Sequence, residues 1–227
     1  MLAVHLLANS VYQLGGMTAS NTFYLGGGLS WNGIQRGQLW QIFTHIWLHG
    51  FWTHLILNAF LFYYAAARLS HVLSSWRILG LFLICGTGAG VAHVLAQAVF
   101  PALPSGPLVG ASGGVFGLLL GFFSLSPGSR MLLIPVSARN LSKGVLISSA
   151  FLFLFTPGLN LPLMSEAGSR LVLWFGTKIF QISHLAHFVG GFLGVLLIPR
   201  FFPRLLTRDD LSRMRQEADS GNEGLAE

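Results

Sequence analysis

No acidic residue occurs in the first 165 positions of this chain. All seven Asp and Glu residues lie from Glu166 onward, and charged residues of both signs make up only 9% of the sequence. A soluble globular domain has about a quarter of its residues charged. Because 53% of the residues are hydrophobic, the composition excludes an ordinary soluble enzyme as well as a disordered chain. It predicts a polytopic membrane protein.

The apolar runs predict where the chain crosses the membrane. A spanning helix needs about 20 mostly apolar residues, so this chain has room for about six spans. We expect an all-α polytopic membrane protein with a membrane domain over residues 1–199 and a charged cytoplasmic tail over residues 200–227. The segment 15–44 is too long for a structureless loop and is expected at the membrane interface. The predicted spans are residues 2–14, 43–67, 77–100, 108–126, 144–157 and 179–199.

Basic residues are distributed unevenly between the predicted spans. Ten lie on the side that holds both chain ends, and three lie on the other side, namely Arg36, Arg170 and Lys178. The positive-inside rule therefore places both termini in the cytoplasm. The same basic flanks account for the net charge of +6, so nucleic acid is not an expected partner.

Polar side chains interrupt the second apolar run at His45, His49, His54 and Asn58. Ionisable residues are costly in hydrocarbon, so these are candidate functional residues. On one continuous helix, His45 and His49 share one side, whereas His54 and Asn58 share the opposite side. Hydrogen bonding between helices and metal binding are alternative interpretations of such pairs.

Ser112 lies in the sequence Gly110-Ala111-Ser112-Gly113, where the fourth apolar run begins after a segment rich in Pro and Gly. This position predicts a helix start, where free N–H groups and the positive end of the helix dipole favour a developing oxyanion. A serine in a span also commonly bonds to a backbone carbonyl. Ser112 is therefore a candidate nucleophile that needs a partner.

Glycines mark one side of the fourth and sixth predicted spans, which allows close helix packing. The glycines are Gly113, Gly117 and Gly121 on the fourth span, and Gly190, Gly191 and Gly194 on the sixth. If these two helices face each other, His187 lies against Ser112, which is the minimum arrangement for an activated nucleophile. Since the spans contain no acid, the arrangement is a Ser-His dyad. The alternative is a packing role alone.

Three sequence elements together resemble the rhomboid family of intramembrane serine proteases. They are the histidines and asparagine at His49, His54 and Asn58, the GxSG element that ends at Gly113, and the AHxxGG element that starts at Ala186. Their order and spacing match the family, and the resemblance extends from about Trp40 to Gly194.

The resemblance implies a rhomboid-like bundle of six transmembrane helices that cleaves transmembrane segments of membrane proteins, without a metal or cofactor. By similarity, Ser112 is the nucleophile and His187 the general base. His54, Asn58 and the N–H of Ser112 are the expected oxyanion donors. His45 and His49 are expected to support the first loop.

Further expectations come from the same resemblance. The enzyme is expected in the inner membrane of a bacterial cell, with its site open to the non-cytoplasmic side. Phe151, Phe153 and Phe155 are gate candidates. Trp40-Gln41 replaces the Trp-Arg of many members, which predicts a weaker polar anchor for the first loop.

Two alternative functions stay open beside the protease. One is a catalytically inactive rhomboid-like protein that binds transmembrane helices, and the other is a helical transporter. The sequence leaves the oligomeric state open.

Overall fold

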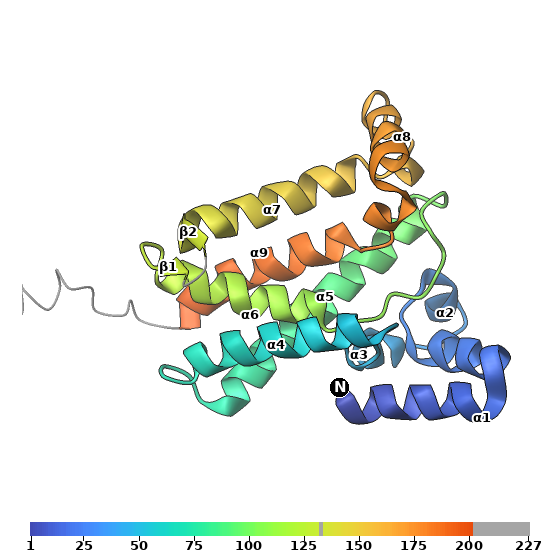
Figure 1. Cartoon of the computed structure of the whole chain (residues 1–227), viewed down its shortest axis with the longest axis horizontal. Helices are drawn as coiled ribbons and strands as arrows, with labels where there is room; N and C mark the ends of the chain where they lie inside the picture. Colours follow the sequence, from blue (N-terminus) through green and yellow to red (C-terminus); the bar gives the residue numbers. More distant parts are fainter. Residues whose placement is uncertain (132–133, 202–227) are drawn as a thin grey trace, which may run out of the picture.

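The computed structural model describes residues 1–131 and 134–201, and Figure 1 shows that they form a helical bundle. Helix α6 lies in its middle, because it contacts four other long helices. The predicted tail over 200–227 lies almost entirely outside the described residues. The long helices are α4 (Trp52–Leu69), α5 (Ser75–Val99), α6 (Ser112–Leu125), α7 (Ala138–Leu154) and α9 (His184–Phe201).

The core is formed by apolar side chains around α6. Val115 and Leu118 are buried against Phe82 of α5 and Ile46 from the segment before α4. On another side of α6, Leu120 packs in a second cluster that includes Ala138 of α7. Because α6 is surrounded, its first residue lies at a junction of several helices.

The mostly helical architecture agrees with the prediction, although helix lengths differ from the expected spans. By length and composition, α5 is the one helix of the described part of the chain that is long and apolar enough to cross a membrane. Helices α6 and α9 are also apolar but shorter. The all-α prediction also missed a short antiparallel pair of strands, β1 (Arg130–Met131) and β2 (Ile134–Ser137).

The N-terminal part of the chain is more helical than expected. Helix α1 (Leu2–Gly27) includes the predicted span 2–14 and bends at Gly16, whose φ of 67° lies in the left-handed region. Figure 1 shows the chain reversing there and shows α1 extending beyond the end of the bundle where α4 begins. The first predicted span therefore does not run alongside the other long helices, because His5 in its first turn is held by the carbonyl of His49 and the ring of Trp52. The rest of the segment 15–44 holds the second part of α1, then α2 (Trp31–Gln35) and α3 (Gln41–Thr44).

The prediction of one continuous helix over 43–67 is wrong. The chain forms α3 and a 3-10 turn, η1 (His45–Trp47), and α4 begins only at Trp52. Leu48 and Phe51 have extended backbone conformations, which break the helix. Between them, the carbonyl of His49 accepts hydrogen bonds from His5 Nδ1 at 3.0 Å and from Tyr24 Oη at 2.8 Å. His45 and His49 are therefore not on the helix of His54 and Asn58.

The region between the fifth and sixth predicted spans is also helical. Helix α7 begins at Ala138, six residues before the predicted start at 144, because the Ser137 side chain caps it by accepting from the N–H of Asn140. After α7 come η2 (Pro157–Leu159), α8 (Met164–Phe175) and η3 (Thr177–Phe180). Helix α8 was not predicted. It projects from the end of the bundle where α7 ends and α9 begins (Figure 1).

Candidate active site

Ser112 is the first residue of α6, as the sequence predicted. The two residues before it are held by the histidines that precede α4. The N–H of Gly110 donates to the carbonyl of His45 at 2.9 Å, and the N–H of Ala111 donates to His49 Nε2 at 3.5 Å. Gly110 has a φ of 128°, which favours glycine. The two residues that precede α6 are thus held by residues far away in the sequence.

Helices α6 and α9 meet along a glycine seam, which we define by Gly113, Gly117, Gly121, Gly190 and Gly194. A Cβ atom on Gly190 would overlap the carbonyl of Gly113, and one on Gly194 would overlap the carbonyl of Gly117. The two backbones are therefore in direct contact. Gly191, the remaining predicted packing glycine, faces outside this seam, against Leu120 and Leu146.

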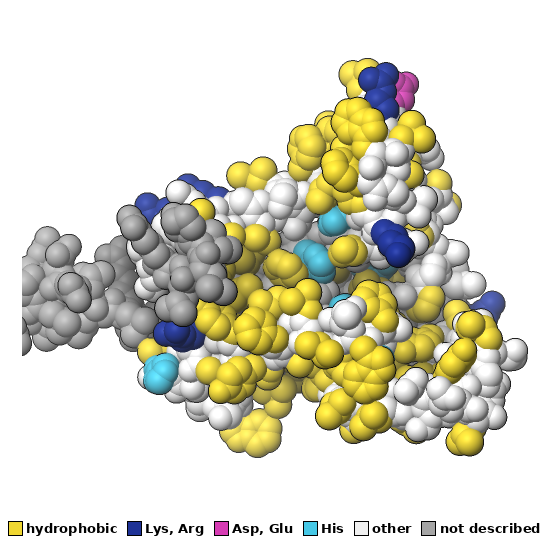
Figure 2. All heavy atoms as spheres, in the orientation of Figure 1, with side chains coloured by type: hydrophobic (Ala, Val, Ile, Leu, Met, Phe, Trp, Pro, Cys, Tyr) yellow, Lys and Arg dark blue, Asp and Glu magenta, His cyan; other side chains and the backbone are white. Residues whose placement is uncertain are grey.

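The glycine seam brings the two predicted catalytic side chains together. His187 Nε2 lies 2.9 Å from Ser112 Oγ, within hydrogen-bond distance. The ring of Phe116, one helical turn after Ser112, stacks on the His187 imidazole with a centroid distance of 4.4 Å and an angle of 23°. Figure 2 shows histidine side chains set back between the surfaces formed by α8 and α4. A hydroxyl paired with an oriented imidazole can act as a nucleophile.

His54 and Asn58 reach this junction from α4. The His54 ring packs over Gly110, where a Cβ atom would lie 2.7 Å from its Cε1 atom. Asn58 is buried, and its Nδ2 donates to the carbonyl of His54 at 2.9 Å. Both side chains are therefore held on the side of α4 that faces the start of α6, where they can supply N–H donors.

His45 and His49 lie behind the site. Both are buried, and His45 Nδ1 donates to the carbonyl of Gln41 at 2.9 Å. The His49 ring lies 5.1 Å from the His54 ring, measured between centroids. Each residue thus connects the segment before α4 with the segment before α6, an arrangement consistent with structural support.

Gln41 itself anchors the first loop. It is completely buried. Its Nε2 donates to the carbonyl of Leu25 at 2.8 Å, and its Oε1 accepts from the N–H of Ser30 at 3.2 Å. A glutamine offers both donor and acceptor, so the loop keeps a polar anchor at the position where the sequence predicted a weakened one.

Comparison with known proteins identifies the family of this chain. A family model described as Rhomboid domain matches residues 36–204, which is most of the chain. The chain belongs to the rhomboid family. Members of this family are integral membrane proteins.

The similarity to individual rhomboids is moderate. The chain is 30% identical to RHOMBOID-like protein 7 of Arabidopsis thaliana over 189 residues, which cover 81% of this chain and 51% of that protein. It is 27% identical to Rhomboid protease GluP of Bacillus subtilis over 139 residues, 61% of this chain and 26% of that protein. The Putative rhomboid protease YdcA of Bacillus subtilis is 34% identical over 86 residues, 38% of this chain and 41% of that protein. The chain thus spans about half or less of the length of these relatives.

Three residues near the site were not predicted from the sequence, namely His93, Phe116 and Ser183. Ser183 Oγ lies 2.8 Å from His93 Nδ1 and accepts from the N–H of Ala186 at 3.3 Å, which ties the start of α9 to α5. His93 could have been identified as a candidate from the sequence, because it is an ionisable residue in an apolar run. The spacing of four residues from Ser112 was the signal for Phe116.

Two further contacts involve His184 and the gate candidates. His184, three residues before His187, donates from Nε2 to the carbonyl of Ile179 at 2.6 Å. Among the gate candidates, Phe151 and Phe155 stack on each other with centroids 4.0 Å apart, and Phe153 lies between them in the sequence.

Proposed function

We propose that this rhomboid is an intramembrane serine endopeptidase that cleaves transmembrane segments of membrane proteins. The observation that carries the proposal is the distance of 2.9 Å between Ser112 Oγ and His187 Nε2, on two helices in backbone contact. A protein that only bound helices would not need this pair.

The chemistry follows from the pair. His187 Nε2 takes the proton of Ser112 while Oγ attacks the scissile carbonyl carbon. The tetrahedral intermediate then expels the amine, which receives the proton from His187, and leaves an acyl-enzyme. A water molecule, deprotonated by His187, attacks the ester and releases the acid. This mechanism requires no carboxylate, and residues 1–165, which include Ser112, contain none.

The oxyanion donors are the N–H of Ser112 and the side chains of His54 and Asn58. The N–H of Ser112 belongs to the first turn of α6, where it has no partner within the helix. The packing of His54 over Gly110 and the burial of Asn58 support this assignment. Donors that are already in place cost no reorganisation during the reaction.

The substrate must expose a peptide bond. A helix in hydrocarbon keeps its carbonyls in internal hydrogen bonds, so a substrate segment has to unwind before attack. We expect cleavage near Gly, Pro or small polar residues, and entry beside α7, where Phe151, Phe153 and Phe155 form the gate.

The proposal includes a topology. We assign five of the expected spans to α4, α5, α6, α7 and α9, and the basic residues favour a cytoplasmic C-terminus with the site open to the other side. The first helix, α1, is not assigned as a span, because His5 in its first turn contacts His49 and Trp52 at the start of α4. The expected setting is a bacterial inner membrane.

Cleavage of single-span substrates in liposomes tests this function. Wild type and Ser112→Ala are incubated with a panel of fluorescent substrates, and the cut is located by mass spectrometry. We expect wild type to cut within the transmembrane segment and Ser112→Ala to be inactive. Specific binding of the same substrates without any cleavage would instead indicate the inactive, helix-binding alternative.

A further inference from the structure

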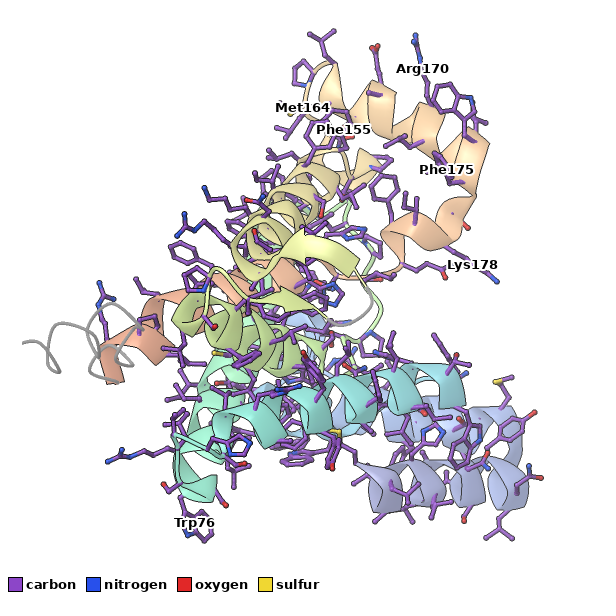
Figure 3. The ribbon with its side chains drawn as sticks, turned by 60° about the vertical axis from the view of Figure 1, so that its left-hand side comes forward. Trp76, Phe155, Met164, Arg170, Phe175 and Lys178 are labelled. Carbon is purple, nitrogen blue, oxygen red and sulfur yellow. The ribbon has the colours of Figure 1, made fainter. Side chains whose placement is uncertain are left out.

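The segment that joins α7 to α9 forms an arm, which we define as residues 157–180. Its main element, α8, is attached at the end of α7, because Gly168 packs directly against the carbonyl of Phe155. Figures 1 and 3 show α8 leaving the direction of the long helices and projecting beyond them. One side of the arm therefore has no cover from the rest of the described chain.

The exposed end of α8 is apolar and aromatic. We define the aromatic tip as Leu173, Trp174 and Phe175, whose side chains are 82%, 76% and 67% exposed. Three consecutive exposed large apolar residues are unfavourable in water and indicate an interaction surface. Arg170 and Lys178 flank the aromatic tip, and Figure 3 shows both projecting outward on the side of Phe175.

The position of the aromatic tip indicates what covers it. The hydrogen bond between His93 and Ser183 places the last part of α5 beside the start of α9. The first part of α5, with Trp76 exposed at 81% and Arg77 next to it, therefore lies at the opposite end of the bundle. Figure 3 shows Trp76 far from the arm. Exposed tryptophan next to a cation thus occurs at both ends.

The length of α5 matches the thickness of a bilayer. Helix α5 has 25 residues, which corresponds to a length of about 37 Å. A bilayer measures about 30 Å across its hydrocarbon and 40–45 Å with its headgroups. Tryptophan is enriched at both membrane interfaces. Trp76 lies near one end of α5, and the arm that holds Trp174 joins α9 beside its other end.

We propose that the aromatic tip inserts into the headgroup layer of the membrane, where Arg170 and Lys178 bind the phosphates of anionic lipids. The proposal rests on the membrane embedding contained in the proposed function. The charge of the arm supports this partner, because Glu166 is its one acid against two cations. Apolar burial together with attraction to anionic lipids is the usual way in which helices bind to interfaces.

The aromatic tip is connected to α9, the helix that carries the proposed general base His187. The tip continues through η3 into α9, and the bond from His184 to the carbonyl of Ile179 joins η3 to that helix. The tip itself contributes no group to the site. It fixes the arm relative to the membrane surface, at the end of the bundle where the site lies.

A spin label measures this insertion. In a Cys85→Ala background, Leu173→Cys is labelled with a nitroxide, and the protein is reconstituted in vesicles of phosphatidylcholine with or without phosphatidylglycerol. We expect the label to be relaxed more strongly by oxygen than by a water-soluble nickel chelate. Ile147→Cys, on an exposed position of α7, is the lipid reference, and Gly128→Cys, in an exposed loop, is the aqueous reference.

A pair of double variants tests the contribution of the anionic lipid phosphatidylglycerol. The double variant Arg170→Gln, Lys178→Gln is expected to abolish any deeper immersion caused by phosphatidylglycerol. Arg77→Gln, Lys143→Gln, with the same change of charge, is expected to keep it. An equal response of both double variants would overturn the assignment of lipid phosphates to the arm.

The outcomes separate this proposal from the protease. A Leu173 label as accessible to the chelate as the Gly128 label overturns the insertion, as does a label shielded from both reagents, which would indicate a protein partner such as a second copy. Cleavage of substrate is measured separately on the same vesicles, and its interpretation does not depend on the result with the spin label. If insertion is observed without cleavage, the lipid contact stands and the protease does not.

Discussion

The glycine seam and the arm show two ways of joining helices in one molecule. Along the glycine seam, the backbones of α6 and α9 touch, and Gly190 and Gly194 leave no space for a methyl group. The arm is attached mainly at the end of α7 and exposes an aromatic tip. The catalytic candidates lie on the first of these structures, and the proposed membrane contact lies on the second.

The two regions meet different structural requirements. A hydrogen bond of 2.9 Å between two helices requires fixed backbones, and small residues allow this because they bring the helix axes close. A surface that meets lipid needs exposed side chains instead. Substitutions are therefore expected to act very differently in the two regions.

The largest effect is expected in the glycine seam. Gly194→Leu forces a side chain against the carbonyl of Gly117, and such overpacking is expected to lower the free energy of unfolding by about 3 kcal/mol or more. Gly144→Leu on α7, where a Cβ atom meets nothing within 4 Å, is the control and is expected to be neutral or slightly stabilising. Unfolding in detergent measures both, and equal stabilities would show that the glycine seam is not tightly packed.

The next effect concerns the proposed oxyanion donors. Asn58→Ala is expected to lower kcat about 100- to 1,000-fold, equivalent to about 3 to 4 kcal/mol, because a transition-state donor is lost. Its thermal stability is expected to change far less. Asn140→Ala, at an exposed position of α7, is the control in the cleavage assay. Unchanged kcat in Asn58→Ala would remove this residue from the mechanism.

A smaller effect is expected behind the site. His49→Phe keeps a ring but removes the acceptor of the Ala111 N–H, and an unpaired buried N–H costs about 1–3 kcal/mol. We expect roughly a tenfold or greater loss of kcat from the displaced start of α6, since about 1.4 kcal/mol corresponds to a factor of ten. His71→Phe, at an exposed histidine, is the control. If both variants retain full activity, His49 does not position Ser112.

The smallest effect on folding is expected in the arm. Leu173→Ser in detergent is expected to change the free energy of unfolding by no more than about 0.5 kcal/mol, as is usual for surface positions. Leu120→Ser, at a fully buried leucine of α6, is expected to be strongly destabilising. Thermal unfolding compares the two, and a similar loss in both would mean that the aromatic tip packs against protein.

The meeting of Ser112 and His187 was predictable from the glycine periodicity of both spans together with the resemblance to the rhomboid family, since both depend on patterns within the sequence. Prediction failed where long-range hydrogen bonds decide the backbone. The carbonyl of His49 bonds to His5 and Tyr24, and no helical period in residues 43–67 contains that information.

The arm escaped prediction for a different reason. Helix α8 combines Glu166 and Arg170 with exposed apolar residues, so it has neither the length of a span nor the pattern of a helix that packs on a core. The role of Gln41 was also missed, because its partners Leu25 and Ser30 come from a loop whose shape depends on tertiary contacts.

Labelling of the protein with a fluorophosphonate probe tests the central claim most directly. If Ser112 is activated by His187, wild type reacts covalently with the probe, mass spectrometry finds the adduct on Ser112, and both Ser112→Ala and His187→Ala lose the labelling while remaining folded. Folded wild type that stays unlabelled, or His187→Ala that is labelled as well as wild type, would contradict it.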